Sequence, residues 1–227
     1  MTATRSRRAC GEAVGTALLL ATVVGSGIQA EQLSQGNVAL ALLVNAIATG
    51  AALVALILAL GPISGAHLNP VVTLVLAWRK DLPRADVPSY LIAQFVGAIV
   101  GVVIAHLMFD LAPIAASEHV REGASQAGSE IVATFGLVLV ILLTAHRRDT
   151  SVAYAVGAYI TAAYWFTAST SFANPAVTVA RAFTPTFSGI RPSDVPVFLV
   201  AQLVGAALAA LAVAGLDGPR QPEGATE

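Results

Sequence analysis

The feature that most constrains this chain is a pair of Asn-Pro motifs, each followed by a short apolar run. The first, Asn69-Pro70-Val71, lies in SGAHLNPVVTLVLA, and the second, Asn174-Pro175-Ala176, lies in SFANPAVTVARAF. Asn is favoured as a helix N-cap and Pro at the first helical position, so each motif predicts the start of a helix. The first helix should end near Ala77, because the polar segment Trp78-Arg79-Lys80-Asp81 follows it.

Both predicted helices are too short to cross a bilayer. At about 1.5 Å per residue, the first reaches roughly half of a ~30 Å hydrocarbon core. A broken helix end at membrane depth is tolerated only where it is buried in protein or faces water. Two such segments at matching places in two halves of a chain predict the position of a substrate path.

The composition requires a membrane environment. Mean hydropathy is +0.77 and only 11% of residues are charged, against about 25% in soluble domains. No basic stretch suggests nucleic acid as a partner, and Cys10 is the only cysteine, which excludes an internal disulfide and a cysteine metal site. We therefore predict no metal and no cofactor. The apolar run after Arg5 carries Glu12 and is read as a retained helix, not as a signal peptide.

Apart from the two short helices, the sequence predicts six spans. They cover 9–28, 37–60, 88–109, 127–145, 151–170 and 197–216. Gly61-Pro62 is expected to end the second span, and 217–227 is expected to be disordered. The prediction is an all-α membrane protein, one channel domain over 1–227 with halves at 9–109 and 127–216, built from six transmembrane helices and two re-entrant half-helices.

The distribution of Lys and Arg predicts the orientation. With six spans, both termini lie on one side, and that side carries nine of the 12 cationic residues: Arg5, Arg7, Arg8, Arg79, Lys80, Arg84, Arg147, Arg148 and Arg220. The other side carries three: Arg121, Arg181 and Arg191. Cytoplasmic loops are enriched in Lys and Arg, so both termini are predicted to be cytoplasmic, in a multi-pass protein of the plasma membrane.

The two halves of the chain repeat each other. The segment from Tyr90 to Gln94 is echoed 108 residues later by the segment from Phe198 to Gln202, and Glu12 has its counterpart in Glu130. Each half has three spans, an odd number, so the second half must be inverted relative to the first. The half-helices then enter from opposite faces, and their N-termini meet near the middle of the membrane.

On SGAHLNPVVT and the second Asn-Pro-Ala motif, the chain resembles the major intrinsic protein family, the aquaporins and aquaglyceroporins, from Glu12 to Leu216. The resemblance implies the aquaporin-like fold, a homotetramer with one pore in each subunit, and a channel rather than an enzyme. The two motifs, residues 69–71 and 174–176, then form the pore centre.

The pore centre has a chemistry that suits neutral solutes. Two facing helix N-termini create a positive potential of about half a charge each, which repels cations including protons. The side-chain amides of Asn69 and Asn174 can donate to a passing oxygen. Glu12 and Glu130 are costly in apolar spans, and the resemblance implies that they accept hydrogen bonds from the half-helix loops. We favour this supporting role over a proton relay.

The predicted selectivity filter departs from the family pattern. Most members read Asn-Pro-Ala-Arg, whereas this chain has Val177 at the Arg position. The family spacing assigns the other filter positions to Thr49, Ala162 and Ser171. These four residues include no aromatic, no His and no Arg, so the filter should be wide and weakly polar.

Two further residues have alternative roles. His67 can line the pore or make a structural hydrogen bond to its loop. Arg181, one helical turn after Val177, can replace the missing charge at another depth or can be an ordinary arginine that extends to the membrane surface.

Function is expected to follow from the wide filter. The first hypothesis is passive passage of glycerol-like polyols, water and metalloid hydroxides such as arsenous acid, which is uncharged and carries three hydroxyls. The resemblance to bacterial aquaglyceroporins from arsenic-resistance settings, with Val at the filter Arg position, favours it. The alternatives are a water channel with an atypical filter, an ion-coupled secondary transporter, and an intramembrane hydrolase using Ser64 and His67. The expected partners are small neutral solutes and the lipid bilayer.

Overall fold

The structure is a computed structural model, and it describes residues 3–145 and 150–216. Residues 146–149, and the segment 217–227 that is predicted to be disordered, lie outside the described residues. The described elements are helical, which confirms the all-α prediction. They are α1 (Arg5–Leu33), α2 (Val38–Ser64), α3 (Pro70–Trp78), α4 (Val87–Met108), α5 (Ala124–Thr144), α6 (Ser151–Phe166), α7 (Pro175–Arg181) and α8 (Val195–Leu216), with single 3-10 turns at Arg84–Asp86 and Pro192–Asp194.

Several predicted boundaries differ from the structure. Helix α1 (Arg5–Leu33) extends beyond both ends of the predicted span 9–28. Helix α2 continues through Pro62 to Ser64 and ends at Gly65, which has a left-handed φ of 87°. Pro62 has no N–H for the carbonyl four residues earlier, and the helix ends within one turn after it, at a glycine that adopts positive φ without strain. Helix α6 ends at Phe166 rather than near residue 170, because residues 167–173 leave the helix to reach the interior.

Five of the described helices are long and apolar enough to cross a membrane: α1, α2, α4 with its preceding 3-10 turn, α5 and α8. Helix α6, with 16 residues, is shorter but lies alongside α2 and α5. Helices α3 and α7 have 9 and 7 residues. The structure therefore has the predicted combination of long and half-length helices.

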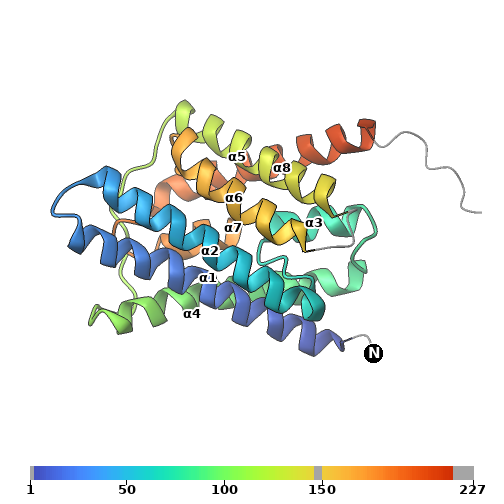
Figure 1. The fold of residues 1–227 in the computed structure, drawn as a ribbon, viewed down its shortest axis with the longest axis horizontal. Coiled ribbons are helices and arrows are strands. Elements are labelled where there is room, and N and C mark those ends of the chain that lie inside the picture. Colours follow the sequence, from blue (N-terminus) through green and yellow to red (C-terminus); the bar gives the residue numbers. More distant parts are fainter. Residues whose placement is uncertain (1–2, 146–149, 217–227) are drawn as a thin grey trace, which may run out of the picture.

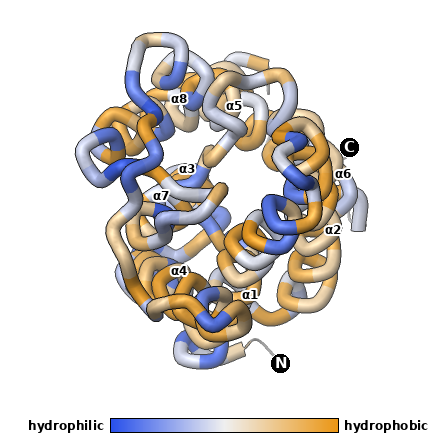
Figure 2. The backbone as a smooth tube through the Cα atoms, turned by 90° about the vertical axis from the view of Figure 1, so that its left-hand side faces the viewer, coloured by the Kyte–Doolittle hydropathy of each residue, from blue (hydrophilic) through white to orange (hydrophobic). Residues whose placement is uncertain are grey.

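The long helices form a ring, and the two short helices lie inside it between α4 and α8 (Figure 2). The chain runs back and forth along the long axis (Figure 1). The face at which α1 begins and α3 ends is called the N-terminal face. The face at which α1 and α7 terminate is called the opposite face. Since α3 and α7 run outward from the middle to different faces, their N-termini both lie in the interior.

Glycines allow the closest helix crossings. Helix α1 packs most extensively against α4, and α5 packs in the same way against α8. A Cβ placed on Gly97 of α4 would lie 2.3 Å from the carbonyl oxygen of Ala13, and one on Gly205 of α8 would lie 2.4 Å from that of Ile131. Small residues that let backbones approach are typical of helix association in membranes.

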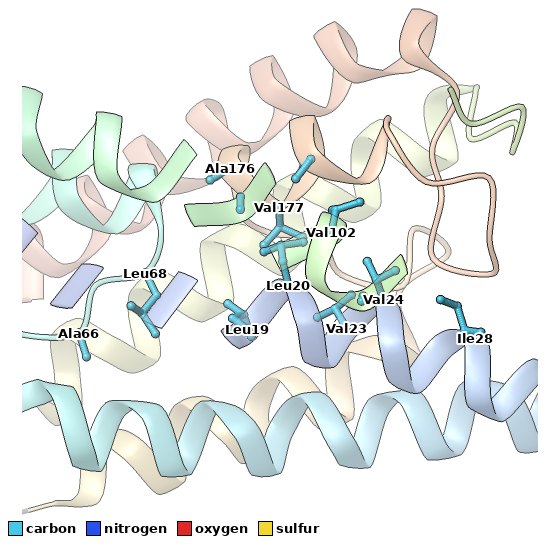
Figure 3. Packing of buried hydrophobic residues seen from close by; sticks show 13 residues of the cluster. Leu19, Leu20, Val23, Val24, Ile28, Ala66, Leu68, Val102, Ala176 and Val177 are labelled. Carbon is cyan, nitrogen blue, oxygen red and sulfur yellow. The ribbon is translucent and has the colours of Figure 1, made fainter. Parts of the chain in front are cut away.

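An apolar cluster fixes α7 against the first half. Val177 and Ala176 of α7 pack with Leu20 of α1 and Val102 of α4, all of them at most 5% exposed (Figure 3). This cluster joins residues from both repeats. It therefore sets the position of the second half-helix relative to the first half of the chain.

Candidate functional site

The site is built from two short loops that lead into the half-helices. Before Asn69, Ala66 and Leu68 have left-handed φ values of 48° and 50°; before Asn174, Ser171 and Ala173 have values of 50° and 47°. A residue with a Cβ loses about 1–2 kcal/mol in this conformation. Both loops must therefore be held in place by strong interactions with their surroundings.

Glu12 holds the first loop. Its carboxylate accepts hydrogen bonds from the Ser64 hydroxyl (2.7 Å), from the backbone N–H groups of His67 (3.0 Å) and Leu68 (2.7 Å), and from the Gln94 amide (2.8 Å). The side chain is fully buried. Hydrogen bonds to an ionised group are about twice as strong as neutral ones, so these bonds offset the strain of the loop.

Glu130 holds the second loop in the same way. It accepts from the Ser169 hydroxyl (2.6 Å), from the N–H groups of Phe172 (2.9 Å) and Ala173 (2.9 Å), and from the Gln202 amide (2.6 Å). Each of these contacts has a counterpart at Glu12, with the same type of donor on the corresponding carboxylate oxygen. The inverted repeat therefore extends to the side-chain contacts of the two loops. Both oxygens of each carboxylate are occupied by uncharged donors.

The two Asn side chains tie the loops to each other. The Asn69 side-chain oxygen accepts from the N–H of Val71 (3.0 Å), and its amide nitrogen donates to the carbonyl of Ala173 (2.8 Å). Asn174 caps α7 and donates to the carbonyl of Leu68 (2.8 Å). An amide has two N–H donors, so each Asn keeps a second donor for another acceptor.

Both Asn residues line one cavity of about 100 Å³. Toward the N-terminal face, its wall is mostly apolar and includes Leu76, Ile141 and Val152. Toward the opposite face, its wall carries polar groups: Thr49, Tyr164, Ser171 and Arg181. A narrow apolar cavity with a few placed donors suits a small solute with hydroxyl groups.

Three of the four predicted filter residues, Thr49, Ser171 and Val177, line this cavity. Ala162 does not: it is exposed on the outer surface of α6, and Tyr164 lines the cavity instead. Two residues turn a helix by about 200°, so a two-residue shift in alignment moves a side chain to the other face. The Tyr164 and Thr49 hydroxyls are hydrogen-bonded at 3.2 Å.

Four of the six residues assigned to the pore centre do not line the cavity. Pro70 and Pro175 begin the two half-helices, Val71 packs in an apolar cluster with α5 and α8, and Ala176 packs against α1 and α4. Only the caps, Asn69 and Asn174, face the space between the helix ends. The motif residues after each Asn therefore do not line the cavity, whereas the two Asn caps do.

His67 lines the cavity, and the partner of its ring is on α3 rather than on its own loop. Its Nδ1 lies 3.1 Å from the Thr73 hydroxyl. Its ring is tilted against Tyr90 with centroids 5.1 Å apart. This imidazole is therefore oriented by its neighbours.

Arg181 does not extend to the membrane surface, because it is only 2% exposed and lines the cavity. Its guanidinium carbon lies 3.4 Å from the ring centroid of Phe172, which also lines the cavity, and its Nε donates to the carbonyl of Ser188. The cavity wall therefore includes two aromatic residues and an Arg, namely Tyr164, Phe172 and Arg181, in addition to the predicted Thr49, Ser171 and Val177.

Sequence reasoning also missed Arg121, although the repeat shows that the second half lacks one hydroxyl donor. In the first half, the Tyr90 hydroxyl donates to the Ser64 carbonyl (2.7 Å). Its counterpart Phe198 has no hydroxyl. The equivalent carbonyl, that of Ser169, instead accepts from a guanidinium nitrogen of Arg121 (3.3 Å). The change from Tyr to Phe between the repeats therefore required a donor from elsewhere in the chain.

Comparison with known proteins agrees with this geometry. The sequence model of the family described as Major intrinsic protein matches residues 1–153 and 143–226. The chain is 56% identical over 217 residues to Aquaglyceroporin AqpS of Rhizobium meliloti (strain 1021), covering 96% of this chain and 93% of that relative. It is 34% identical over 146 residues to the Glycerol uptake facilitator protein of Bacillus subtilis (strain 168), covering 58% and 53%. The X-ray structure of the aquaglyceroporin from Plasmodium falciparum has the same fold, with a TM-score of 0.76, 22% identity, and coverage of 95% and 98%.

Proposed function

Because the chain belongs to the major intrinsic protein family, we propose that it is a passive channel for small uncharged solutes, with glycerol-like polyols as the substrate class. One observation carries the proposal: Asn69 and Asn174 line one narrow cavity at the point where two half-helix N-termini meet. Both amides have a donor left for a solute hydroxyl, and the helix ends repel cations. Relatives named for glycerol uptake and as aquaglyceroporins support this substrate class.

The alternatives find less support in the geometry. An ion-coupled transporter would need an available carboxylate in the membrane to bind its coupling cation, but Glu12 and Glu130 are each occupied by neutral donors at four contacts. A hydrolase would need a nucleophile next to a base. The Ser64 hydroxyl donates to Glu12, while the His67 ring contacts Thr73.

The filter supports a broader substrate range. A solute with several hydroxyls can form hydrogen bonds with the hydroxyls of Thr49, Tyr164 and Ser171. The fourth position is Val177, so no rigid arginine narrows the path there. Arsenous acid has this chemistry, and we include metalloid hydroxides and water among the solutes. The homotetramer and the cytoplasmic termini stay predictions.

Val177→Arg should slow glycerol entry at least about ten-fold while leaving water entry less affected. Val177 is 5% exposed and lines a cavity of about 100 Å³, so a longer cationic side chain narrows the path. Light scattering of proteoliposomes in glycerol, arsenous acid and water gradients measures each rate. Val179→Arg, on the same short helix but outside the cavity lining, is the control.

Two results would contradict the proposal. If wild-type vesicles admit none of these solutes faster than protein-free vesicles do, the chain is not such a channel. If they admit water alone, the atypical water channel is correct and the filter is narrow.

Tyr164 sets the width of the filter from α6. Replacement by Ala should raise the permeability ratio of erythritol to glycerol by roughly ten-fold, because the ring is removed from the cavity wall. Tyr164→Phe removes only the hydroxyl that bonds Thr49 and should leave the ratio nearly unchanged. The same vesicle assay with the two polyols measures it, and an unchanged ratio in the Ala variant places the narrowest point elsewhere.

A further inference from the structure

Two buried arginines share one aromatic ring beside the cavity. The guanidinium carbons of Arg181 and Arg121 lie 3.4 Å and 4.9 Å from the centroid of Phe172. Their exposed fractions are 2% and 8%. Arg181 comes from α7 and Arg121 from the connection between α4 and α5, so the fold brings together two charges that are 60 residues apart.

The groups that contact these guanidiniums are uncharged. Arg121 donates to the carbonyls of Gly189 (2.8 Å) and Ser169 (3.3 Å), and Arg181 donates to that of Ser188. Among the ion pairs formed by the described residues, neither arginine takes part. Buried charges are normally paired, so this region has an excess of positive charge.

The nearby carboxylates are engaged elsewhere. Glu130 is occupied by its four loop contacts. Asp194 accepts the backbone N–H of Arg121 (2.8 Å) and pairs with the side chain of Arg191 (2.8 Å). Neither carboxylate forms a direct ion pair with the guanidiniums on Phe172.

The electrostatic influence of the two arginines reaches the adjoining loop. The pKa of His119 lies below its usual value because of burial and because of Arg121 and Arg181. Burial lowers the pKa of Arg121 to about 10, partly countered by Glu130 and Tyr164. Arg121 therefore stays protonated at neutral pH.

On the cavity side, a second observation points to a ligand. The Ser171 hydroxyl is buried and has no hydrogen-bond partner among the described residues, and Ser171 lines the same cavity as Arg181. Thr49 and Tyr164 add hydroxyls to this wall. An unused donor in the same cavity wall as a guanidinium that forms no ion pair among the described residues suits an acceptor that carries negative charge.

We propose that the half of the cavity toward the opposite face is a binding site for a small planar oxyanion, held by Arg181 and Ser171 with Arg121 supplying further charge. A guanidinium presents its N–H groups in a plane that matches such an anion, whereas a halide cannot form the paired contact. The site rests on the proposed pore, because its cavity is the solute path, and a bound anion competes with the neutral solute.

Nitrate is the probe, since it is planar and has no uncharged form near neutral pH. Nitrate replaces chloride at fixed ionic strength on both sides of the vesicles, so that channels of either orientation are reached. With a Kd on the order of 10 mM, about 100 mM nitrate should slow glycerol entry through the wild-type channel by about ten-fold. Arg181→Gln should abolish this inhibition, and Arg121→Gln and Ser171→Ala should weaken it.

Arg191→Gln is the matched control, because Arg191 lies on the same face but pairs with Glu122 and Asp194 outside the cavity. It should keep the full inhibition. Equal inhibition in wild type and in Arg181→Gln, or none in wild type, overturns the site. If Arg181→Gln does not fold, Ser171→Ala still tests the site, because its inhibition by nitrate should be weaker than that of wild type.

Binding can also be measured without transport. In detergent, exchange of chloride for nitrate should raise the melting temperature of wild type more than it raises that of Arg181→Gln. If vesicles show no glycerol entry but this difference is present, the proposed function fails and the anion site stands. If entry is fast but the difference and the inhibition are both absent, the site fails alone.

Discussion

Glu130→Gln should abolish solute entry and lower the free energy of unfolding by about 3 kcal/mol or more. The carboxylate accepts four hydrogen bonds within 2.9 Å, two of them from the backbone N–H groups of Phe172 and Ala173. A glutamine keeps the shape but presents N–H donors to donors, and its oxygen can satisfy only part of the set. The loop before Asn174 contains three left-handed residues, Thr170, Ser171 and Ala173, and should leave this conformation.

Thermal unfolding in detergent and glycerol entry into vesicles measure the two effects. Glu118→Gln, on the connection between α4 and α5, is the control and should change neither. Because the repeat places Glu12 in the same contacts, Glu12→Gln should produce an effect of similar size. A fully active, stable Glu130→Gln channel would falsify the view that this carboxylate holds the loop.

Gly97→Val is expected to destabilise the protein by more than about 3 kcal/mol, since the nearest obstacles are backbone atoms that cannot move aside. A Cβ on Gly97 would lie 2.3 Å from the carbonyl oxygen of Ala13 and 3.0 Å from its carbon. Helices α1 and α4 would have to separate, and Glu12 on α1 would then move away from Gln94 on α4. One substitution at a helix crossing should therefore also disturb the first loop and stop solute entry.

Gly128→Val provides the matched comparison. Gly128 also lies within a long helix, α5, but a Cβ there meets nothing within 4 Å. Valine has a slightly higher helix propensity than glycine at both positions, so the difference between the two melting temperatures reports mainly the crossing. Similar melting temperatures would show that α1 and α4 can separate at little cost.

The sequence by itself determined the architecture of this protein. The N-cap and proline chemistry of Asn69 and Asn174 specifies two helix starts, and the apolar lengths around them specify spanning and half-length helices. The repeat from Tyr90 to Gln94 and from Phe198 to Gln202, with three spans in each half, specifies the inversion. These are local or periodic signals, and they can be read without knowledge of which residues touch.

Only the tertiary structure decided the composition of the cavity wall. Which face of α6 points inward depends on how that helix packs, and an alignment shift of two residues exchanged Tyr164 for Ala162. Arg121 reaches Phe172 and the Ser169 carbonyl across a long connection, and no spacing rule encodes such a contact. The physical reason is that side-chain direction along a helix and the path of a loop are fixed by packing between segments far apart in the chain. The residues of the cavity wall therefore depend on non-local contacts, whereas helix starts depend on their immediate neighbours.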